Sequence, residues 1–476
     1  MNTHQENVKR SVVLLLSFVD LIILSAIYAG FWFAEFYPTL RMRRMSVNGV
    51  IYFTEGLKFY LRGHLLILLI YFALLWFFLG TYGGLRIGYL KAPDLFFSQI
   101  FAITIVNVLT YLYSSLMRNW IMPGWPYLFM TILQLSATLL WTLLASAVYR
   151  RAFPPRRLLL VHGVHSVEEI RRKFLSRRDK YTIARLVDIS LGVPAVERLY
   201  EEGSYDAIVI WDVPTTQRNE LLKYCYGKNI RIYTSPKISD VLIKGSEQLH
   251  LFDTPIFLIR EQSIRAEQLA MKRLSDILLA LVLIVVTSPI MLVTALLVHF
   301  TDGGPVLYRQ VRCTQGMRRF QILKFRSMRI DAEKDGVARL ATRHDDRITP
   351  VGRFIRSVRI DELPQLFNIL KGEMSFIGPR PERPEIIEEY LKTMPEFIFR
   401  THVKAGLAGY AQVYGKYNTT PYDKLKLDLT YIENYSIWLD LKLMLLTLKI
   451  LFTPDATEGV EQGQITAEVK DAEKKG

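Results

Sequence analysis

The sequence has little cysteine, fewer acidic than basic residues, and several long stretches with almost no charge. Two cysteines, Cys225 and Cys313, occur in 476 residues, so at most one disulfide can form and a disulfide-stabilised scaffold is excluded. The 60 Lys and Arg outnumber the 45 Asp and Glu, and the net charge is +15. Half of the residues are hydrophobic and the mean hydropathy is +0.17, which excludes a disordered or fibrous protein. High apolar content and high charge in one chain indicate that the two are segregated along it.

The stretches without charge define four candidate membrane spans within residues 1–150. The first, residues 11–36, contains Asp20 and, near its end, Glu35, whereas residues 64–82, 95–117 and 125–149 contain no charged side chain. Each is close to the ~20 residues that a helix needs to cross the hydrocarbon core of a bilayer. We therefore predict a membrane protein with a four-helix transmembrane bundle at residues 1–150.

A basic segment follows the fourth span. It contains Arg150, Arg151, Arg156 and Arg157. Because basic residues accumulate on the cytoplasmic side of membrane spans, everything downstream is predicted to be cytoplasmic.

Residues 151–262 alternate between strand-like and helix-like patterns. Strands are expected at 158–163, 206–213 and 230–235, with helical segments between them. This alternation predicts a small α/β domain with a parallel sheet. The turn after the first strand, VHGVHS, lacks the G-x-G-x-x-G pattern of a dinucleotide site. We therefore interpret the domain as Rossmann-like and non-catalytic, with nucleotide binding left open as the alternative.

A further apolar run, residues 277–298, contains Ser288 and Pro289 at its middle. Proline inside a helix removes one backbone hydrogen bond and bends the helix at a cost of ~3 kcal/mol. Basic residues flank both ends of the run, whereas a full crossing should be asymmetric in charge. We predict a re-entrant helix at 274–300 that bends at Ser288 and Pro289 and returns to the same side. The alternative is a fifth span with a proline kink.

The chemistry is expected in residues 263–453, an α+β domain anchored by that helix. Lys324 and Arg326 alternate along a predicted strand and could clamp a phosphate. Farther on, Pro364 is expected to interrupt a helix beside Asp361 and Glu362. Adjacent carboxylates could hold Mg²⁺ together with substrate phosphates, or one could attack phosphorus and form an acyl phosphate. Taken alone, the pair would more simply be a solvated helix end.

Two further motifs accompany the acidic pair. The segment SFIGPRPERPE offers Arg380 on a stiff loop of glycine and proline, where a guanidinium can bind phosphate oxygens in bidentate fashion. The segment 406–416, GLAGYAQVYGK, places three glycines among aromatic and small residues.

In this order, KFRSM (324–328), RSVRIDELPQLFNILKGEMSFIGPRP (356–381) and GLAGYAQVYGK, downstream of a helix broken by Ser-Pro, resemble the bacterial sugar transferases. These are monotopic phosphoglycosyl transferases that use a polyprenyl phosphate, and the resemblance covers residues 262–452. The four spans and the α/β domain resemble the long form of the family, which initiates exopolysaccharide, capsule or O-antigen synthesis.

The resemblance implies a ping-pong reaction that moves a sugar 1-phosphate from a UDP-sugar to undecaprenyl phosphate and releases UMP. Asp361 matches the nucleophile, and Glu362 matches the partner that helps to hold Mg²⁺. Arg356 and Arg380 match basic positions that contact phosphate or nucleotide, with Lys324 and Arg326 as further candidates. Ser288 and Pro289 match the break of the membrane helix. Ala405 replaces a proline that many members have, which loosens the following turn.

The resemblance also implies that the protein lies in the bacterial cytoplasmic membrane, with its catalytic domain on the cytoplasmic face. Its implied partners are membrane lipids and a UDP-sugar whose hexose is glucose or galactose. A homo-oligomer is possible. Nucleic-acid binding is not expected, because no binding motif accompanies the charge. Residues 454–476 are polar and acid-rich and are predicted to be disordered.

Two alternatives remain open. A membrane-anchored nucleotide-sugar dehydratase or epimerase would need a glycine-rich turn and a Tyr-x-x-x-Lys pair; Tyr422 and Lys426 have that spacing but follow no such turn. A non-enzymatic membrane regulator of polysaccharide assembly would not need the acidic pair, Arg380 and Pro289 together.

Overall fold

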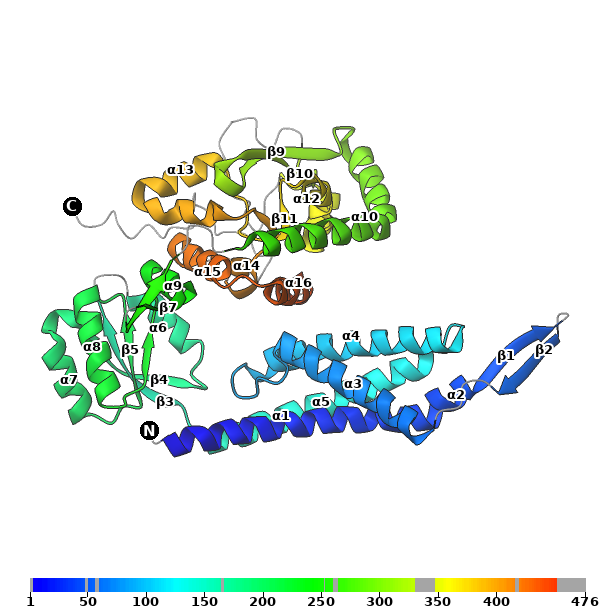
Figure 1. Cartoon of the computed structure of the whole chain (residues 1–476), viewed down its shortest axis with the longest axis horizontal. Coiled ribbons are helices and arrows are strands. Elements are labelled where there is room, and N and C mark those ends of the chain that lie inside the picture. Colours follow the sequence, from blue (N-terminus) through cyan, green and yellow to red (C-terminus); the bar gives the residue numbers. More distant parts are fainter. Residues whose placement is uncertain are drawn as a thin grey trace. The chain divides into compact units, whose positions relative to one another are not determined.

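The computed structural model describes residues 3–47, 50–55, 60–163, 167–251, 253–259, 264–329, 347–415 and 419–451. The chain forms two compact units, Met1–Ser235 and Pro236–Gly476. Figure 1 traces the elements of both units, and each is described by itself. The predicted disorder after residue 454 lies outside the described residues.

Unit 1 begins with long apolar helices, as the uncharged stretches predicted. They are α1 (Thr3–Phe31), continued by a π-helical turn η1 (Trp32–Phe36) and α2 (Tyr37–Arg41), then α3 (Leu61–Tyr82), α4 (Ala92–Arg118) and α5 (Gly124–Ala152). An antiparallel hairpin, β1 (Met42–Val47) and β2 (Val50–Glu55), separates α2 from α3. With α10 of unit 2, the described residues contain five helices long and apolar enough to cross a membrane.

Polar side chains hold these helices together from inside. Gln134 on α5 donates to the hydroxyl of Tyr71 on α3 (2.8 Å) and accepts from Asn107 on α4 (2.8 Å). Asp20 on α1 is fully buried and accepts from the amide of Gln99 on α4 (2.7 Å). Buried polar groups in an apolar bundle need partners on neighbouring helices, so these contacts fix which helices are adjacent.

The second part of unit 1 is the predicted α/β domain with a parallel sheet. Its elements are β3 (Arg156–His162), α6 (Val167–Leu175), β4 (Tyr181–Asp188), η2 (Ile189–Leu191), α7 (Val193–Glu202), β5 (Ala207–Trp211), α8 (Thr215–Gly227) and β6 (Ile232–Thr234). The strands are all parallel, in the order β4-β3-β5-β6. The strands predicted at 158–163, 206–213 and 230–235 correspond to β3, β5 and β6.

Unit 2 is a mixed helical and stranded body. Before its long helix lie α9 (Ile238–Gly245), β7 (Glu247–Leu251) and β8 (Thr254–Leu258); then come α10 (Ala266–Asp302), β9 (Leu307–Cys313), η3 (Gln315–Met317) and β10 (Arg319–Phe325). The acidic pair belongs to the next group, α11 (Pro350–Ser357), η4 (Ile360–Glu362), α12 (Gln365–Lys371) and β11 (Ser375–Ile377). The remainder is α13 (Pro384–Thr393), η5 (Pro395–His402), β12 (Gly406–Ala408), α14 (Tyr410–Tyr414), α15 (Pro421–Glu433) and α16 (Ile437–Leu451). Strands β9 and β10 pair antiparallel, and β11 and β12 pair in parallel.

Helix α10 carries Pro289 in its interior and bends, as Figure 1 shows. Proline has no N–H to donate to the carbonyl four residues earlier, which belongs to Val285. The hydroxyl of Ser288 donates to that carbonyl instead (2.8 Å). The Ser-Pro pair therefore bends the helix while leaving the freed carbonyl with a partner, which an apolar surrounding requires.

Both halves of α10 pack on the same body. In the first half, Ala280 belongs to the main core of unit 2. In the second half, Val298 packs with Phe325 of β10 and Ile355 of α11. A straight helix of 37 residues would be ~55 Å long at 1.5 Å per residue and would carry its far end away from a body of this size. The bend returns the second half to the body.

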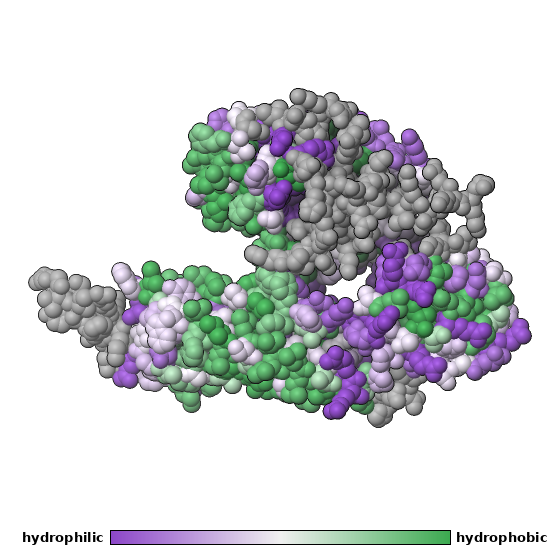
Figure 2. All heavy atoms as spheres, turned by 180° about the vertical axis from the view of Figure 1, so that it is seen from behind, coloured by the Kyte–Doolittle hydropathy of each residue, from purple (hydrophilic) through white to green (hydrophobic). Residues whose placement is uncertain are grey.

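The outer face of α10 is apolar and exposed. Its exposed large side chains include Leu274, Leu278, Leu281, Val285, Ile290, Val293 and Leu297. Figure 2, seen from behind, shows such apolar side chains on the surface of unit 2 where α10 lies. A continuous apolar face of this length indicates contact with lipid.

Candidate active site

The acidic pair lies on a short turn between two helices. Helix α11 begins at Pro350 and is capped by Thr349, whose hydroxyl accepts from the N–H of Gly352 (2.9 Å). It ends before Arg359, which has a positive φ of 58° and reverses the chain. Asp361 and Glu362 follow in the single turn η4.

The predicted position of the helix break was wrong. Pro364 does not interrupt a helix; it precedes the first residue of α12, where a missing N–H costs little because the first N–H groups of a helix have no partner within it. The chain is reversed instead at Arg359, whose left-handed conformation no sequence pattern indicated.

Asp361 is held in a nearly water-free position. It is 7% exposed. Burial raises the pKa of its carboxyl to about 6, and the neighbouring charge of Glu362 acts in the same direction, while Lys324, Arg356 and Arg359 oppose the rise. The carboxylate is therefore a stronger base than an ordinary aspartate, yet remains largely ionised at neutral pH.

Glu362 is surrounded by cations. Its Oε1 accepts from Nζ of Lys324 (2.9 Å) and from a guanidinium nitrogen of Arg380 (3.2 Å), and it lies 3.9 Å from Arg359. Burial alone would raise the pKa of Glu362, but Lys324, Arg380 and Arg359 together hold it well below its ordinary value. Glu362 in turn raises the pKa of Arg380. The pKa values of the two adjacent acids are thus shifted in opposite directions.

The structure brings most of the predicted site residues together. Lys324 on β10 and Arg380 on the loop after β11 both reach Glu362, and the charge of Arg356 on α11 acts on Asp361. Arg326 differs from expectation, because β10 ends at Phe325 and Arg326 follows it, buried at 8% exposure. The two cations are therefore not on one face of a strand, although only one residue, Phe325, separates them.

The loop that carries Arg380 is fixed by its own backbone. Gly378 donates its N–H to the carbonyl of Ala408 (2.9 Å), and Gly406 donates to the carbonyl of Pro379 (2.9 Å). A Cβ at Gly378 would lie 2.3 Å from the carbonyl oxygen of Lys404, so only glycine permits this approach. The glycines of the two predicted motifs therefore serve one contact between neighbouring loops.

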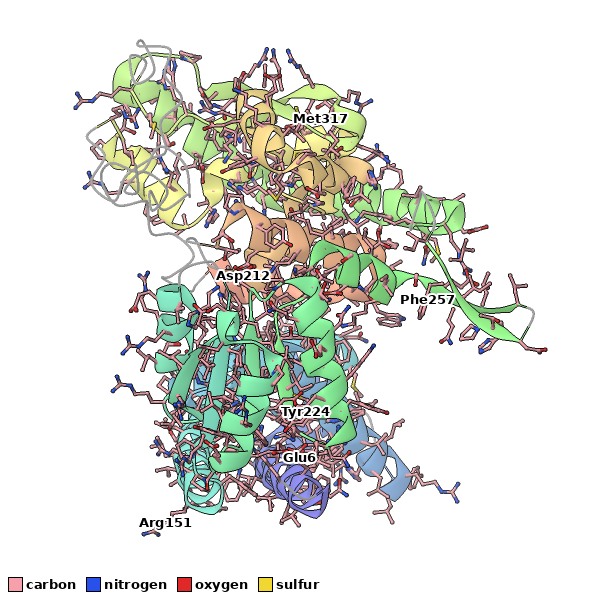
Figure 3. The ribbon with its side chains drawn as sticks, turned by 90° about the vertical axis from the view of Figure 1, so that its left-hand side faces the viewer. Glu6, Arg151, Asp212, Tyr224, Phe257 and Met317 are labelled. Carbon is pink, nitrogen blue, oxygen red and sulfur yellow. The ribbon has the colours of Figure 1, made fainter. Side chains whose placement is uncertain are left out.

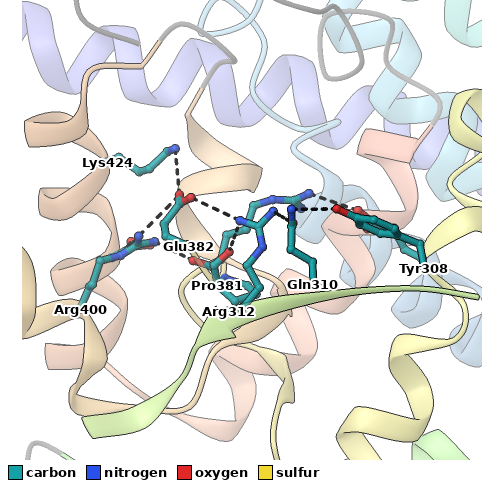
Figure 4. A network of polar contacts seen from close by, with 10 residues as sticks. Tyr308, Gln310, Arg312, Pro381, Glu382, Arg400 and Lys424 are labelled. Atoms are coloured by element: carbon teal, nitrogen blue, oxygen red, sulfur yellow. Dashed lines mark hydrogen bonds and ion pairs between the residues drawn. The ribbon is translucent and has the colours of Figure 1, made fainter. Parts of the chain in front are cut away.

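A second charged network supports the same loop, and sequence reasoning missed it. Glu382 lies between Arg312 (3.9 Å), Arg400 (3.6 Å) and Lys424 (3.6 Å), as Figure 4 shows. Arg400 also donates to the carbonyl of Arg380 (3.0 Å), and Arg312 donates to that of Pro381 (3.2 Å). The position of Glu382 directly after Pro-Arg-Pro was the only local signal, because its partners come from β9, η5 and α15.

The donor set fits Mg²⁺ only with help from a substrate. Within the part of the chain that the structure describes, no three His, Cys, Asp or Glu side chains form a group that could hold a metal. Asp361 and Glu362 supply the one or two carboxylates that Mg²⁺ commonly takes from protein, the other ligands being substrate phosphates and water. Oε1 of Glu362 already faces Lys324 and Arg380, which leaves its other oxygen and those of Asp361.

Chemically, the site combines one carboxylate of raised basicity with a frame of fixed cations. A buried carboxylate can act as a nucleophile, and cations that surround it can stabilise the charge of phosphate groups. The arrangement suits phosphoryl transfer, in which positioning and charge stabilisation do most of the work.

Comparison with known proteins points in the same direction. The family described as "Bacterial sugar transferase" matches residues 267–454. A UDP-N-acetylgalactosamine-undecaprenyl-phosphate N-acetylgalactosaminephosphotransferase of Aeromonas hydrophila is 38% identical over 52% of this chain and 59% of its own. A UDP-glucose:undecaprenyl-phosphate glucose-1-phosphate transferase of Klebsiella pneumoniae is 40% identical over 43% of each chain.

A shorter relative is matched over most of its length. It is a UDP-glucose:undecaprenyl-phosphate glucose-1-phosphate transferase of Caulobacter vibrioides, 40% identical over 39% of this chain and 70% of its own. The chain spans about half the length of the two longer relatives. The similarity therefore centres on unit 2, which contains the acidic pair, the bent helix and the Arg380 loop.

Proposed function

Because the chain belongs to the bacterial sugar transferase family, we propose that it transfers a sugar 1-phosphate from a UDP-sugar to a polyprenyl phosphate and releases UMP. The observation that supports this most directly is the pairing of a buried, more basic Asp361 with Glu362, which Lys324 and Arg380 hold in place. In this proposal the chain performs the first membrane step of exopolysaccharide, capsule or O-antigen synthesis.

Asp361 acts as the nucleophile in a ping-pong reaction. A carboxylate oxygen bonds to the β-phosphorus of the UDP-sugar while the bond from that phosphorus to the bridging oxygen breaks, and the electron pair leaves with UMP. An oxygen of polyprenyl phosphate then attacks the same phosphorus, and the Asp361 carboxylate leaves. Arg380 and Lys324 contact the phosphate oxygens, with Arg356 and Arg326 as further contacts to phosphate or nucleotide.

Mg²⁺ is the proposed cofactor. Asp361 and Glu362 would hold it with the diphosphate, and when bound it supplies positive charge to the phosphate oxygens. Burial of Asp361 excludes water from the acyl phosphate, which limits its hydrolysis before the lipid arrives.

The sugar is proposed as a hexose. Glucose or galactose is the default from the resemblance. The names of the relatives include both glucose and N-acetylgalactosamine, so the amino sugar belongs in the test as well.

The test is nucleotide release. Purified protein in detergent with Mg²⁺ and undecaprenyl phosphate receives a panel of UDP-sugars, and UMP and UDP are quantified separately. We expect UMP with one sugar, because the diphosphate is cleaved. Release of UDP instead would mean ordinary glycosyl transfer and would contradict the role of Asp361. Neither nucleotide with any donor would favour the regulator alternative.

We further propose a membrane topology in which α1, α3, α4 and α5 span as a four-helix bundle and α10 is re-entrant. The Rossmann-like α/β domain and the catalytic domain then share the cytoplasmic side of the inner membrane. The bend of α10, the packing of both its halves on one body and its exposed apolar face support a helix that enters and leaves the same leaflet. A fifth span would carry the second half away from β10 and α11.

Cysteine labelling checks this topology. Thr301, exposed near the end of α10, is changed to cysteine. We expect labelling by a membrane-impermeant maleimide only after the cytoplasmic side is opened. Trp120→Cys, in the exposed link between α4 and α5, is the control and should react from the outside. The native Cys225 and Cys313 are buried and give little background. Reaction of Thr301→Cys from the outside would mean that α10 crosses fully.

A further inference from the structure

Within unit 1, the membrane helices meet the α/β domain through a cluster of charged side chains. Glu6, near the start of α1 and labelled in Figure 3, pairs with both Arg156 of β3 (2.9 Å) and Arg231, which precedes β6. Arg156 also donates to the hydroxyl of Tyr233 (2.8 Å). One carboxylate thus connects the first membrane helix to strand β3 and to the residue directly before β6.

Two lysines of the cluster lie over aromatic rings, and among the described residues neither forms an ion pair with a carboxylate. Nζ of Lys9 on α1 lies 5.2 Å from the ring centre of Tyr149, and Nζ of Lys180 lies 4.0 Å from that of Tyr89. The backbone of Gly88, the residue before Tyr89, packs against the ring of Tyr149, because a Cβ at Gly88 would lie 2.3 Å from Cζ of Tyr149. The positive charge of Lys9 also acts on Lys180. Both amines therefore border the same corner, formed by the Gly88–Tyr89 turn and the end of α5.

The cluster contains more positive than negative charge. Its basic members are Lys9, Arg156, Arg177, Lys180 and Arg231, and its acidic members among the described residues are Glu6, Asp179 and Asp94, whose charge acts on Arg177. Glu6 is shared by two arginines, and Asp179 is engaged by Arg177 (2.9 Å). Burial, followed by the nearby charge of Arg177, lowers the pKa of Lys180 to about 8. An anion placed here would relieve this repulsion.

The position of the cluster indicates the source of the anion. Lys9 lies two residues before the apolar run of α1, Tyr89 lies between α3 and α4, and Tyr149 lies near the end of α5. Basic and aromatic side chains at the ends of membrane helices lie at the depth of lipid headgroups. We propose that the phosphate of an anionic phospholipid of the cytoplasmic leaflet binds between Lys9 and Lys180 and joins the membrane helices to the α/β domain. Which leaflet supplies the lipid rests on the topology proposed above.

The test uses the full chain in neutral detergent, titrated with phosphatidylglycerol or phosphatidylcholine and followed by native mass spectrometry. Each basic side chain near a membrane surface contributes about fivefold to affinity for anionic lipid, so Lys9→Gln with Lys180→Gln should weaken phosphatidylglycerol binding about 25-fold. Hydrogen exchange localises the effect: phosphatidylglycerol should protect residues 86–91 and 177–181 in the unchanged protein and not in the double variant.

Matched variants make the result specific. Lys223→Gln with Lys228→Gln removes the same charge from α8 and its end, where Lys228 pairs with Glu201, and should leave binding unchanged. Lys9→Arg with Lys180→Arg keeps the charge and should retain binding, which separates loss of the site from misfolding. If Lys9→Gln with Lys180→Gln binds phosphatidylglycerol as tightly as Lys223→Gln with Lys228→Gln, the proposal is overturned. Equal protection by inorganic phosphate, or by undecaprenyl phosphate alone, would also overturn it, because the ligand would then not be a phospholipid.

Discussion

Replacement of Asp361 by Asn is expected to abolish turnover, with a loss of about 10⁴-fold or more in the rate of UMP release. The amide keeps the size of the side chain but has no carboxylate oxygen to bond to phosphorus, so the covalent route is lost rather than slowed. The measurement is the rate of UMP release with the preferred UDP-sugar and undecaprenyl phosphate.

A second readout separates loss of the nucleophile from loss of binding. Without the lipid acceptor, the unchanged protein should release one burst of UMP equal to the amount of enzyme, because the phosphosugar stays on Asp361. Asp361→Asn should release no burst. Asp188→Asn, in the α/β domain, keeps an oxygen that can accept from the N–H of Ser190 and should leave activity intact. A normal burst in Asp361→Asn would remove Asp361 from the mechanism.

The membrane helices could be predicted because their signal is local. Lipid excludes charge, so a run of ~20 uncharged residues is informative without any knowledge of its neighbours. The same is true of the central strands β3 and β5, each of which has four consecutive buried side chains. Strand β4 was missed, although it belongs to the same sheet. It lies at the edge, most of its side chains are not buried, and Arg185 interrupts its apolar pattern.

The site could be predicted only in part, for a related reason. Asp361, Glu362 and Arg380 stand in dense local motifs, and the structure places them within reach of one another. The network around Glu382 depends on Arg312, Arg400 and Lys424, which are separated from it by up to 70 residues of chain. No pattern within one segment indicates such a contact. The reversal at Arg359 is likewise a product of tertiary packing, because arginine has no preference for a positive φ.

The charged networks around Glu362 and Glu382 position Arg380 in different ways. Glu362 follows Asp361 in the chain and holds the side chains of Lys324 and Arg380. Glu382 pairs with Arg400 and Arg312. These two arginines donate hydrogen bonds to the backbone carbonyls of Arg380 and Pro381, respectively. The partners of Glu382 fix the backbone of Arg380, and Glu362 fixes its guanidinium. Because both its backbone and its guanidinium are held in place, Arg380 loses little conformational freedom when a phosphate binds.

Glu362→Gln is therefore expected to lower turnover by about 10²–10³-fold while leaving a slow burst of UMP, because Asp361 is still present. Loss of the carboxylate removes the anion that Lys324 and Arg380 share. They are then free to pair with Asp361, which lowers its pKa and weakens it as a nucleophile.

A metal titration tests the second proposed role of Glu362. If Glu362 holds Mg²⁺ with Asp361, the Mg²⁺ concentration for half-maximal activity should rise in Glu362→Gln; an unchanged titration would restrict Glu362 to positioning the cations. Glu388→Gln is the matched control. Glu388 forms an exposed ion pair with Arg319 (3.7 Å), so its replacement should change neither rate nor metal dependence. If Glu362→Gln is as active as Glu388→Gln, then Glu362 neither positions the cations nor holds the metal. Removing a buried carboxylate with two close cationic partners should move those partners and so change the rate.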